Sequence, residues 1–267
     1  MKKAHLLMIT LIFTNITTYV CSEPVNTFDG KWIDLTHDFS ETSIYWPTAD
    51  KFKKTEVFEG TTKDGFYYSA NNFSAAEHGG THLDAPVHFA KNRHTVEQIP
   101  LEQLIGPGIV IRVINQSKEN RNYQLSVQDI LNWENKYGII ADNSIVLIDT
   151  GSSKLWPNLK QYMGTDERGS EAVSNLQFPG IHPDAAEFLA TKRKIKALGL
   201  DTPSIDFGGS TLFEAHQVLF SKNIPGFENV AHLDKLPIKG FSVIALPMKI
   251  KSGSGAPLRI VAFIPTK

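Results

Sequence analysis

Hydrophobic and polar positions along the chain form two kinds of pattern, short apolar or alternating runs and stretches with helical spacing. The runs are typical of strands, and they fall at residues 31–35, 66–73, 108–114, 144–149, 197–200, 241–247 and 258–265. Apolar residues with helical spacing lie at residues 126–136, 183–194 and 211–221. Ser126 is a favourable N-cap for the first helix, and Pro183 suits the first position of the second.

Buried strands that alternate with helices indicate an α/β fold. Hairpin-like stretches near the N-terminus favour a mixed sheet over a purely parallel one. No repeat, low-complexity tract or Pro/Gly-rich linker divides residues 23–267. The chain has 267 residues, of which 41% are hydrophobic and 21% charged. We therefore predict one globular domain with a substantial core.

The first residues differ in composition from the rest of the chain. Lys2 and Lys3 precede an uncharged stretch, residues 4–22, with a short apolar core. This is the pattern of a secretory signal peptide, and the core is shorter than the roughly 20 apolar residues of a membrane span. We expect residues 1–22 to be a signal peptide cleaved before Glu23, which would make the protein secreted. An uncleaved signal anchor is the alternative.

Charge and cysteine content narrow the function classes. The formal net charge is −1, and no basic block is longer than Lys192 to Lys194. We therefore expect no nucleic-acid partner and, after signal cleavage, no membrane partner. The single cysteine, Cys21, would leave with the leader, so any metal ligands must be histidine, aspartate or glutamate. Glycosylation triplets begin at Asn72 and Asn115.

Residues 78–88 read His-Gly-Gly-Thr-His-Leu-Asp-Ala-Pro-Val-His. Two glycines and a proline argue against a helix. In an extended chain, His78, His82, Asp84 and His88 share one parity and would point to one face, with the apolar residues between them packed behind. The two glycines, residues 79 and 80, would let the backbone bend tightly so that the first two histidines converge. Imidazole and carboxylate ligands suit Zn²⁺, Mn²⁺ or Fe²⁺. One short segment can supply at most about three ligands, which would leave coordination positions open for water and substrate. The alternative is a histidine-rich surface loop without metal.

Two further residues become candidates only as partners of this cluster. His216 lies on the apolar face of the helix predicted at residues 211–221, where a single histidine is more often part of the core. Glu228 follows a turn-like Ile-Pro-Gly sequence and by itself would be interpreted as a surface charge.

The string at residues 78–88 resembles the His-x-Gly-Thr-His-x-Asp-x-Pro-x-His signature of the cyclase family, which includes bacterial-type kynurenine formamidases and isatin hydrolases. The resemblance extends to residues 199–206, to the spacing of His216 and Glu228, and to the Pro-Met-Lys sequence at residues 247–249. It implies an α/β fold of the swivelling β/β/α type, assembled as homodimers or homotetramers. It also implies Zn²⁺ or Mn²⁺, with one or two ions per subunit.

The resemblance also assigns roles to the residues. It implies that His78 and His82 bind one metal, that Asp84 bridges two, and that His216 binds the second. Glu228 would contact both ions.

The same resemblance makes His88 the proton donor and acceptor, and an unperturbed imidazole titrates near neutrality. It places Trp46 against an aromatic substrate ring, although a core position beside Pro47 is equally compatible with the sequence. The function expected is hydrolysis of a small cyclic or N-formyl amide by metal-activated water. Lactone hydrolysis, a cyclase or dehydratase step, and a secreted binding protein without turnover are the alternatives. Because N-formylkynurenine arises inside cells, the predicted export argues against that particular substrate.

Overall fold

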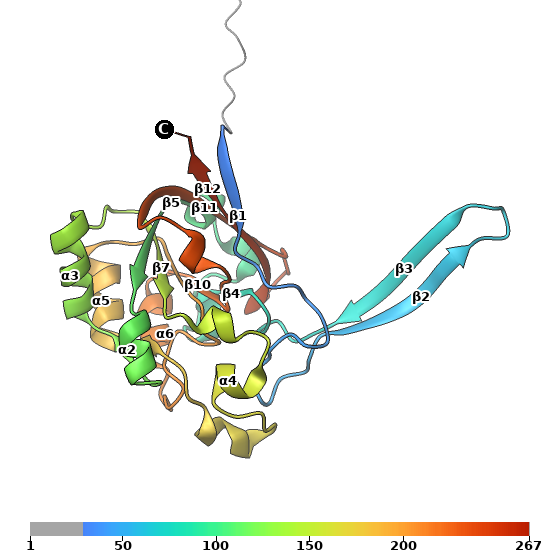
Figure 1. The fold of residues 1–267 in the computed structure, drawn as a ribbon, viewed down its shortest axis with the longest axis horizontal. Helices are drawn as coiled ribbons and strands as arrows, with labels where there is room; N and C mark the ends of the chain where they lie inside the picture. Colours follow the sequence, from blue (N-terminus) through green and yellow to red (C-terminus); the bar gives the residue numbers. More distant parts are fainter. Residues whose placement is uncertain (1–28, 267) are drawn as a thin grey trace, which may run out of the picture.

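The computed structural model describes residues 29–266, which form one domain from which a long hairpin projects (Figure 1). Residues 1–22, expected to be a signal peptide, lie outside the described residues. Among those described, no helix is long and apolar enough to cross a membrane.

The domain is built on an eight-stranded sheet with the order β1-β12-β11-β5-β7-β9-β10-β4. Because β12 also pairs with β4, seven of these strands close into a barrel. The pairs β5–β7, β7–β9 and β9–β10 are parallel and the others antiparallel, so the predicted mixed sheet is confirmed. The strands are β1 (Gly30–Asp34), β4 (His82–Asp84), β5 (Ile105–Arg112), β7 (Ile145–Asp149), β9 (Ala197–Leu200), β10 (Gly226–Glu228), β11 (Lys239–Pro247) and β12 (Gly255–Pro265).

Two apolar cores cover the two faces of the sheet. The first includes Leu147, Phe227 and Ile260, from β7, β10 and β12. The second lies between the parallel strands and the helices α3 (Val127–Tyr137), α5 (Pro183–Lys192) and α6 (Glu214–Ser221). Strands β7 and β9 are buried along their whole length, which explains why their sequences read as continuous apolar runs.

Local signals in the sequence fix where the helices begin. The Ser126 hydroxyl accepts a hydrogen bond from the Asp129 amide, which caps α3 as predicted, and Pro183 opens α5. Helix α6 begins at Glu214 rather than at residue 211, because Phe213 has φ 52°, in the left-handed region. The shorter helices are α1 (Leu101–Leu104), α2 (Ile114–Glu119), α4 (Leu159–Met163) and the 3₁₀ turns η1 (Pro86–His88), η2 (Val96–Gln98), η3 (Ser152–Leu155), η4 (Ser170–Asn175) and η5 (Leu233–Lys235).

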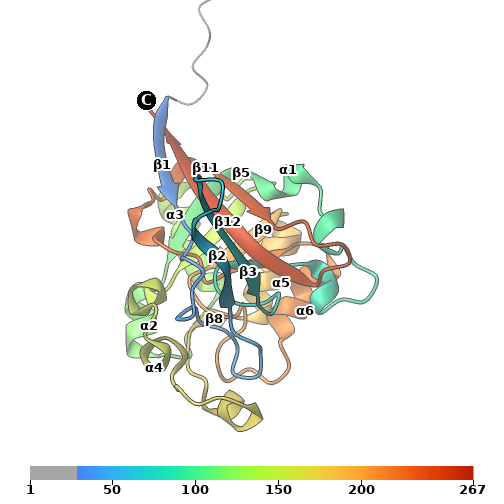
Figure 2. The ribbon, with the colours of Figure 1, turned by 90° about the vertical axis from the view of Figure 1, so that its right-hand side faces the viewer.

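Two small sheets lie apart from the barrel. One pairs β6 (Gln124–Leu125) with β8 (Gly180–Ile181). The other is the projecting hairpin of β2 (Lys53–Thr61) and β3 (Tyr67–Ser74), which extends well beyond the domain in Figure 1 and lies across its front in Figure 2. The sequence predicted an extended segment at residues 66–73 but not its partner strand, whose charged residues hide the alternation.

Candidate metal centre

The segment at residues 78–88 brings its polar side chains together by turning twice. The bend expected at the two glycines is present, but the expectation that the chain stays extended as far as His88 is wrong. Only His82–Asp84 forms a strand, β4. Before it, Gly80 has φ 57°, which favours glycine, and a side chain on Gly79 would collide with the Tyr45 ring. After it, the chain enters the 3₁₀ turn Pro86–His88. The apolar residues between the polar ones do pack behind them, with Leu83 and Ala85 fully buried.

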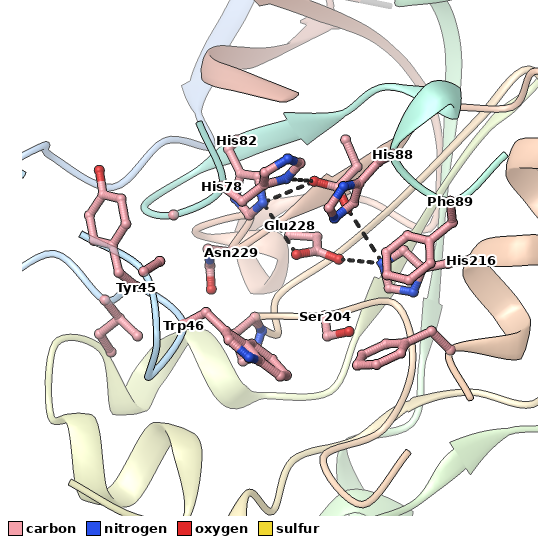
Figure 3. Close-up of a pocket in the computed structure, with 16 residues that line it drawn as sticks. Tyr45, Trp46, His78, His82, His88, Phe89, Ser204, His216, Glu228 and Asn229 are labelled. Carbon is pink, nitrogen blue, oxygen red and sulfur yellow. Dashed lines mark hydrogen bonds and ion pairs between the residues drawn. The ribbon is translucent and has the colours of Figure 1, made fainter. Parts of the chain in front are cut away.

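Pairing of β4 with β10 supplies the second half of the cluster. In the antiparallel register, Glu228 lies directly opposite His82, and such cross-strand neighbours have side chains close together. His216 enters from α6. Its Nε2 lies 3.2 Å from Glu228 Oε1 and 3.4 Å from Asp84 Oδ2. Two residues far along the chain from the motif therefore complete the site (Figure 3).

Asp84 is the centre of the arrangement. Its Oδ1 lies 2.7 Å from His78 Nδ1 and 3.1 Å from His82 Nε2, while Oδ2 faces His216. Glu228 Oε2 lies 3.3 Å from His82 Nε2. The ligand atoms form two groups that share Asp84: His78 with His82 and Asp84, and Asp84 with His216 and Glu228. All five metal ligands implied by the sequence resemblance lie together.

In each of the imidazoles of His78, His82 and His216, one ring nitrogen faces the carboxylates and the other forms a hydrogen bond with a neighbouring group. His82 Nδ1 lies 3.0 Å from the Gly80 carbonyl, and His216 Nδ1 lies 2.6 Å from Asp206 Oδ2. His78 Nε2 lies 2.9 Å from the Ser254 hydroxyl. This is the arrangement of metal-binding histidines, whose outer nitrogen is fixed by a hydrogen bond so that the inner one presents its lone pair.

Two observations indicate that these residues fit a divalent metal. His82 Nε2 is buried and has no partner in hydrogen-bonding geometry among the described residues, although it faces two carboxylates. Buried polar atoms are normally satisfied. The donor set, three imidazole nitrogens and two carboxylates, suits Zn²⁺ or Mn²⁺ and contains enough ligands for one or two ions.

Electrostatics also favour a cation here. Burial opposes the charged form of His82, but the adjacent carboxylates of Asp84 and Glu228 outweigh it and raise the pKa to about 10. Burial would raise the pKa of Asp84, but the charge of His78 and contacts with the surrounding imidazoles hold it well below its usual range. The buried carboxylates of Asp84 and Glu228 thus favour a positive charge beside them, which is the charge that a divalent metal supplies.

His88 lies beside this cluster but belongs to neither ligand group. Its ring stacks on His78 at a centroid distance of 3.8 Å and contacts the Phe89 ring edge at 4.5 Å. Burial lowers the pKa of His88 to about 4, and the charge of Asp84, which acts against burial, does not outweigh it. The ring is therefore neutral at pH 7, rather than titrating near neutrality as an unperturbed imidazole does.

A cavity of about 300 Å³ opens in front of the cluster. Trp46 forms part of its wall and meets the edges of Phe178 and Phe213, each at a centroid distance of 6.3 Å. Trp46 is therefore both packed on the core, as one interpretation held, and exposed to the cavity, as the other required. Phe89 and Ile44 add to the apolar wall.

Sequence reasoning missed the residues that hold the site in shape. The Asn229 amide donates to the Gly80 carbonyl at 2.7 Å, and its backbone carbonyl accepts from Thr81 Oγ1 at 2.7 Å. Asp206 lay within the resemblance but received no role, and Ser254 gave no local signal. Phe89 and Asn229 directly follow predicted site residues, which is the one sequence clue to them.

The chain matches the family model described as putative cyclase over residues 33–207. It is 31% identical to isatin hydrolase of Roseibium aggregatum, over 87% of this chain and 86% of the relative. It is 27% identical to kynurenine formamidase of Salinibacter ruber, over 86% of this chain and 95% of the relative.

Solved structures agree with these sequence matches. Isatin hydrolase A from Labrenzia aggregata, bound to benzyl benzoate, superposes with a TM-score of 0.79 and 30% identity, covering 88% of this chain and 94% of that one. An isatin hydrolase bound to the product analogue thioisatinate superposes with a TM-score of 0.81 and 28% identity, covering 89% of this chain and 94% of that one. These matches, together with the clustered imidazoles and carboxylates, show that the chain belongs to the cyclase family of metal-dependent hydrolases.

Proposed function

We propose that this enzyme hydrolyses a small cyclic or N-formyl amide attached to an aromatic ring, an isatin-like lactam being the first candidate. One observation carries the proposal: five ligand-type side chains, with Asp84 at their centre, face a cavity of about 300 Å³ walled by Trp46 and Phe213. A flat bicyclic amide matches this combination of apolar walls and one polar end.

The metal ligands would be His78, His82, Asp84, His216 and Glu228, which fit one or two ions of Zn²⁺ or Mn²⁺. A bound dication lowers the pKa of water to about 7 and polarises a carbonyl group. His88, which is neutral and lines the cavity, would accept a proton from the attacking water at a ring nitrogen and return it to the leaving amide nitrogen. Trp46 and Phe213 would orient the aromatic ring and exclude water.

Lactone opening and a cyclase or dehydratase step use the same carbonyl chemistry and are therefore outcomes of the test. The predicted signal peptide supports export of the enzyme, and export favours an extracellular lactam over N-formylkynurenine. Family resemblance also supports a homodimer or homotetramer.

The proposal is tested with purified protein of defined metal content. Isatin, N-formylkynurenine and simple lactones are assayed with and without a chelator, and with Zn²⁺ or Mn²⁺ added back. We expect chelator-sensitive opening of at least one amide. If the metal-loaded protein turns over only lactones, lactone hydrolysis replaces amide hydrolysis as the function. If the protein takes up no divalent ion, the proposal is refuted.

A further inference from the structure

A short turn, residues 46–49, supplies Trp46 and Ala49 to the wall of the cavity. Just before this turn the chain is tied to the metal-binding segment, because the Ile44 carbonyl accepts a hydrogen bond from the Gly80 amide at 2.9 Å. Just after it the chain leaves the domain into the projecting hairpin. The position of the turn between these two points decides where the Trp46 ring lies.

Two consecutive residues, Arg168 and Gly169, hold this turn from the other side of the chain. The Arg168 guanidinium donates from Nη1 to the Trp46 carbonyl at 3.1 Å and from Nη2 to the Ala49 carbonyl. The Gly169 amide donates to the Pro47 carbonyl at 3.0 Å. Three carbonyl groups of the turn are therefore fixed from one place in the fold.

The chemistry of Arg168 suits this contact. Its exposed guanidinium forms no ion pair within residues 29–266, and its hydrogen bonds to other residues there go to the turn. A guanidinium presents its N–H donors in a rigid plane, so it can hold two carbonyl groups in a fixed relation to each other. Arg168 thus differs from a solvated surface charge.

The loop that carries Arg168 is itself fixed to the core. A hydrogen bond from the Gln177 amide to the Met163 carbonyl, at 2.8 Å, closes its base. Met163 and Leu176 belong to a small apolar cluster that also contacts Trp46. The loop therefore gives the guanidinium a defined position relative to the cavity.

We propose that Arg168 is a positioning residue, which holds Trp46 in the cavity wall and thereby limits the size of the aromatic ring that the cavity admits. Figure 3 shows Trp46 across the cavity from the cluster of imidazoles and carboxylates. Without Arg168 the turn and its ring would move away from this cluster, and the cavity would widen. The statement about the substrate ring rests on the proposed function, whereas the statement about the position of Trp46 does not.

The first measurement is independent of turnover. In metal-loaded protein labelled with fluorotryptophan, the fluorine resonance of Trp46 is identified by its absence in Trp46→Phe. We expect this resonance to shift or broaden in Arg168→Ala. The control is Lys196→Ala, which removes another cation that donates to two backbone carbonyls, those of Glu102 and Ile105, and it should leave the resonance unchanged. An unchanged Trp46 resonance in Arg168→Ala would overturn the proposal.

The second measurement separates a positioning role from a merely structural one. With the aromatic amide or lactone that the enzyme turns over, Arg168→Ala should raise KM about threefold to tenfold and change kcat little, because the wall contacts the ground state and the transition state alike. In the Trp46→Ala background the same change should raise KM no further, because both substitutions act on one wall. Lys196→Ala should have the kinetics of the wild type.

Two kinetic results would contradict the proposal: a loss of kcat at unchanged KM, and an effect of Arg168→Ala that persists in full when Trp46 is already alanine. If no amide or lactone is turned over at all, the proposed function fails. The fluorine spectrum then still decides whether Arg168 positions Trp46.

Discussion

Ser254 Oγ lies 2.9 Å from His78 Nε2 and 2.7 Å from Glu77 Oε2. Glu77 also accepts hydrogen bonds from the amides of Ser254 and Gly255. The serine hydroxyl can thus accept from His78 Nε2 and donate to Glu77, which fixes the ring with its other nitrogen, Nδ1, directed at Asp84. Gly255 leaves room for this ring, because a side chain there would collide with it.

Removing the Ser254 hydroxyl should therefore weaken metal binding while the fold is preserved. For Ser254→Ala we expect divalent-metal affinity to fall about 10- to 100-fold, measured by competition with a chelating dye. The matched control is Ser242→Ala, the same change at an exposed position on β11 away from the site, which should bind metal like the wild type. Unchanged affinity in Ser254→Ala would contradict the role given to this contact.

Loss of Asp84 and loss of His88 should have different consequences. Asp84 faces all three ligand histidines, so Asp84→Ala should lose bound metal and, with it, turnover. His88 lies in neither ligand group, so His88→Ala should retain metal and lose about 100-fold or more in kcat. Elemental analysis and steady-state kinetics on the same preparations distinguish them. Equal metal content and equal activity in the two variants would refute both assignments.

Truncation of the cavity wall should affect substrate binding more than chemistry. Trp46→Ala removes an aromatic face from the cavity, and we expect KM to rise about tenfold or more, with a smaller change in kcat. Trp32→Ala, a change of the same size on β1 and outside the cavity, is the control and should leave KM unaltered. A kcat loss without any change in KM would indicate that Trp46 acts on the reaction rather than on binding.

Away from the site, Glu134 and Arg193 join α3 to the end of α5. Arg193 Nε and Nη2 donate to the two Glu134 oxygens at 2.5 and 2.6 Å, and the Ile140 amide donates to Oε1. We expect Glu134→Gln to lower the free energy of unfolding by about 2 kcal/mol at pH 7, because it leaves the guanidinium unpaired. This is less than for a fully buried pair, since Arg193 keeps part of its contact with water. Urea unfolding of the metal-free wild type and variant measures the difference in free energy of unfolding.

The ion pair of Glu134 with Arg193 also makes the free energy of unfolding depend on pH. The hydrogen bonds from Arg193 lower the pKa of Glu134 below its ordinary value. A lowered folded-state pKa means that the stabilisation is fully present above the unfolded pKa, about 4.3, and is lost as pH falls through the folded pKa. The difference between wild type and Glu134→Gln should therefore shrink in acid. Glu187→Gln, which removes the exposed pair with Lys222, should cost under about 1 kcal/mol at any pH.

The sequence by itself determined the α/β class, most of the strands and three principal helices, because apolar period and capping residues are local signals. It also singled out the candidate ligands, since His78, His82 and Asp84 are close neighbours in the chain and the family resemblance added His216 and Glu228. The even spacing of these residues correctly predicted a shared face for His82 and Asp84, which both lie in β4. It does not apply to His88, which lies in a 3₁₀ turn.

Only the tertiary structure decided how these pieces meet. Closure of the barrel places Glu228 opposite His82 and Gly255 opposite Asp84, and no local pattern encodes pairing between strands so distant in sequence. Burial lowers the pKa of His88, which depends on neighbours from α6 and the cavity wall. The projecting hairpin, too, was decided by the tertiary structure, because only the pairing of β2 with β3 shows that the aromatic-rich segment at residues 66–73 belongs to an exposed ribbon.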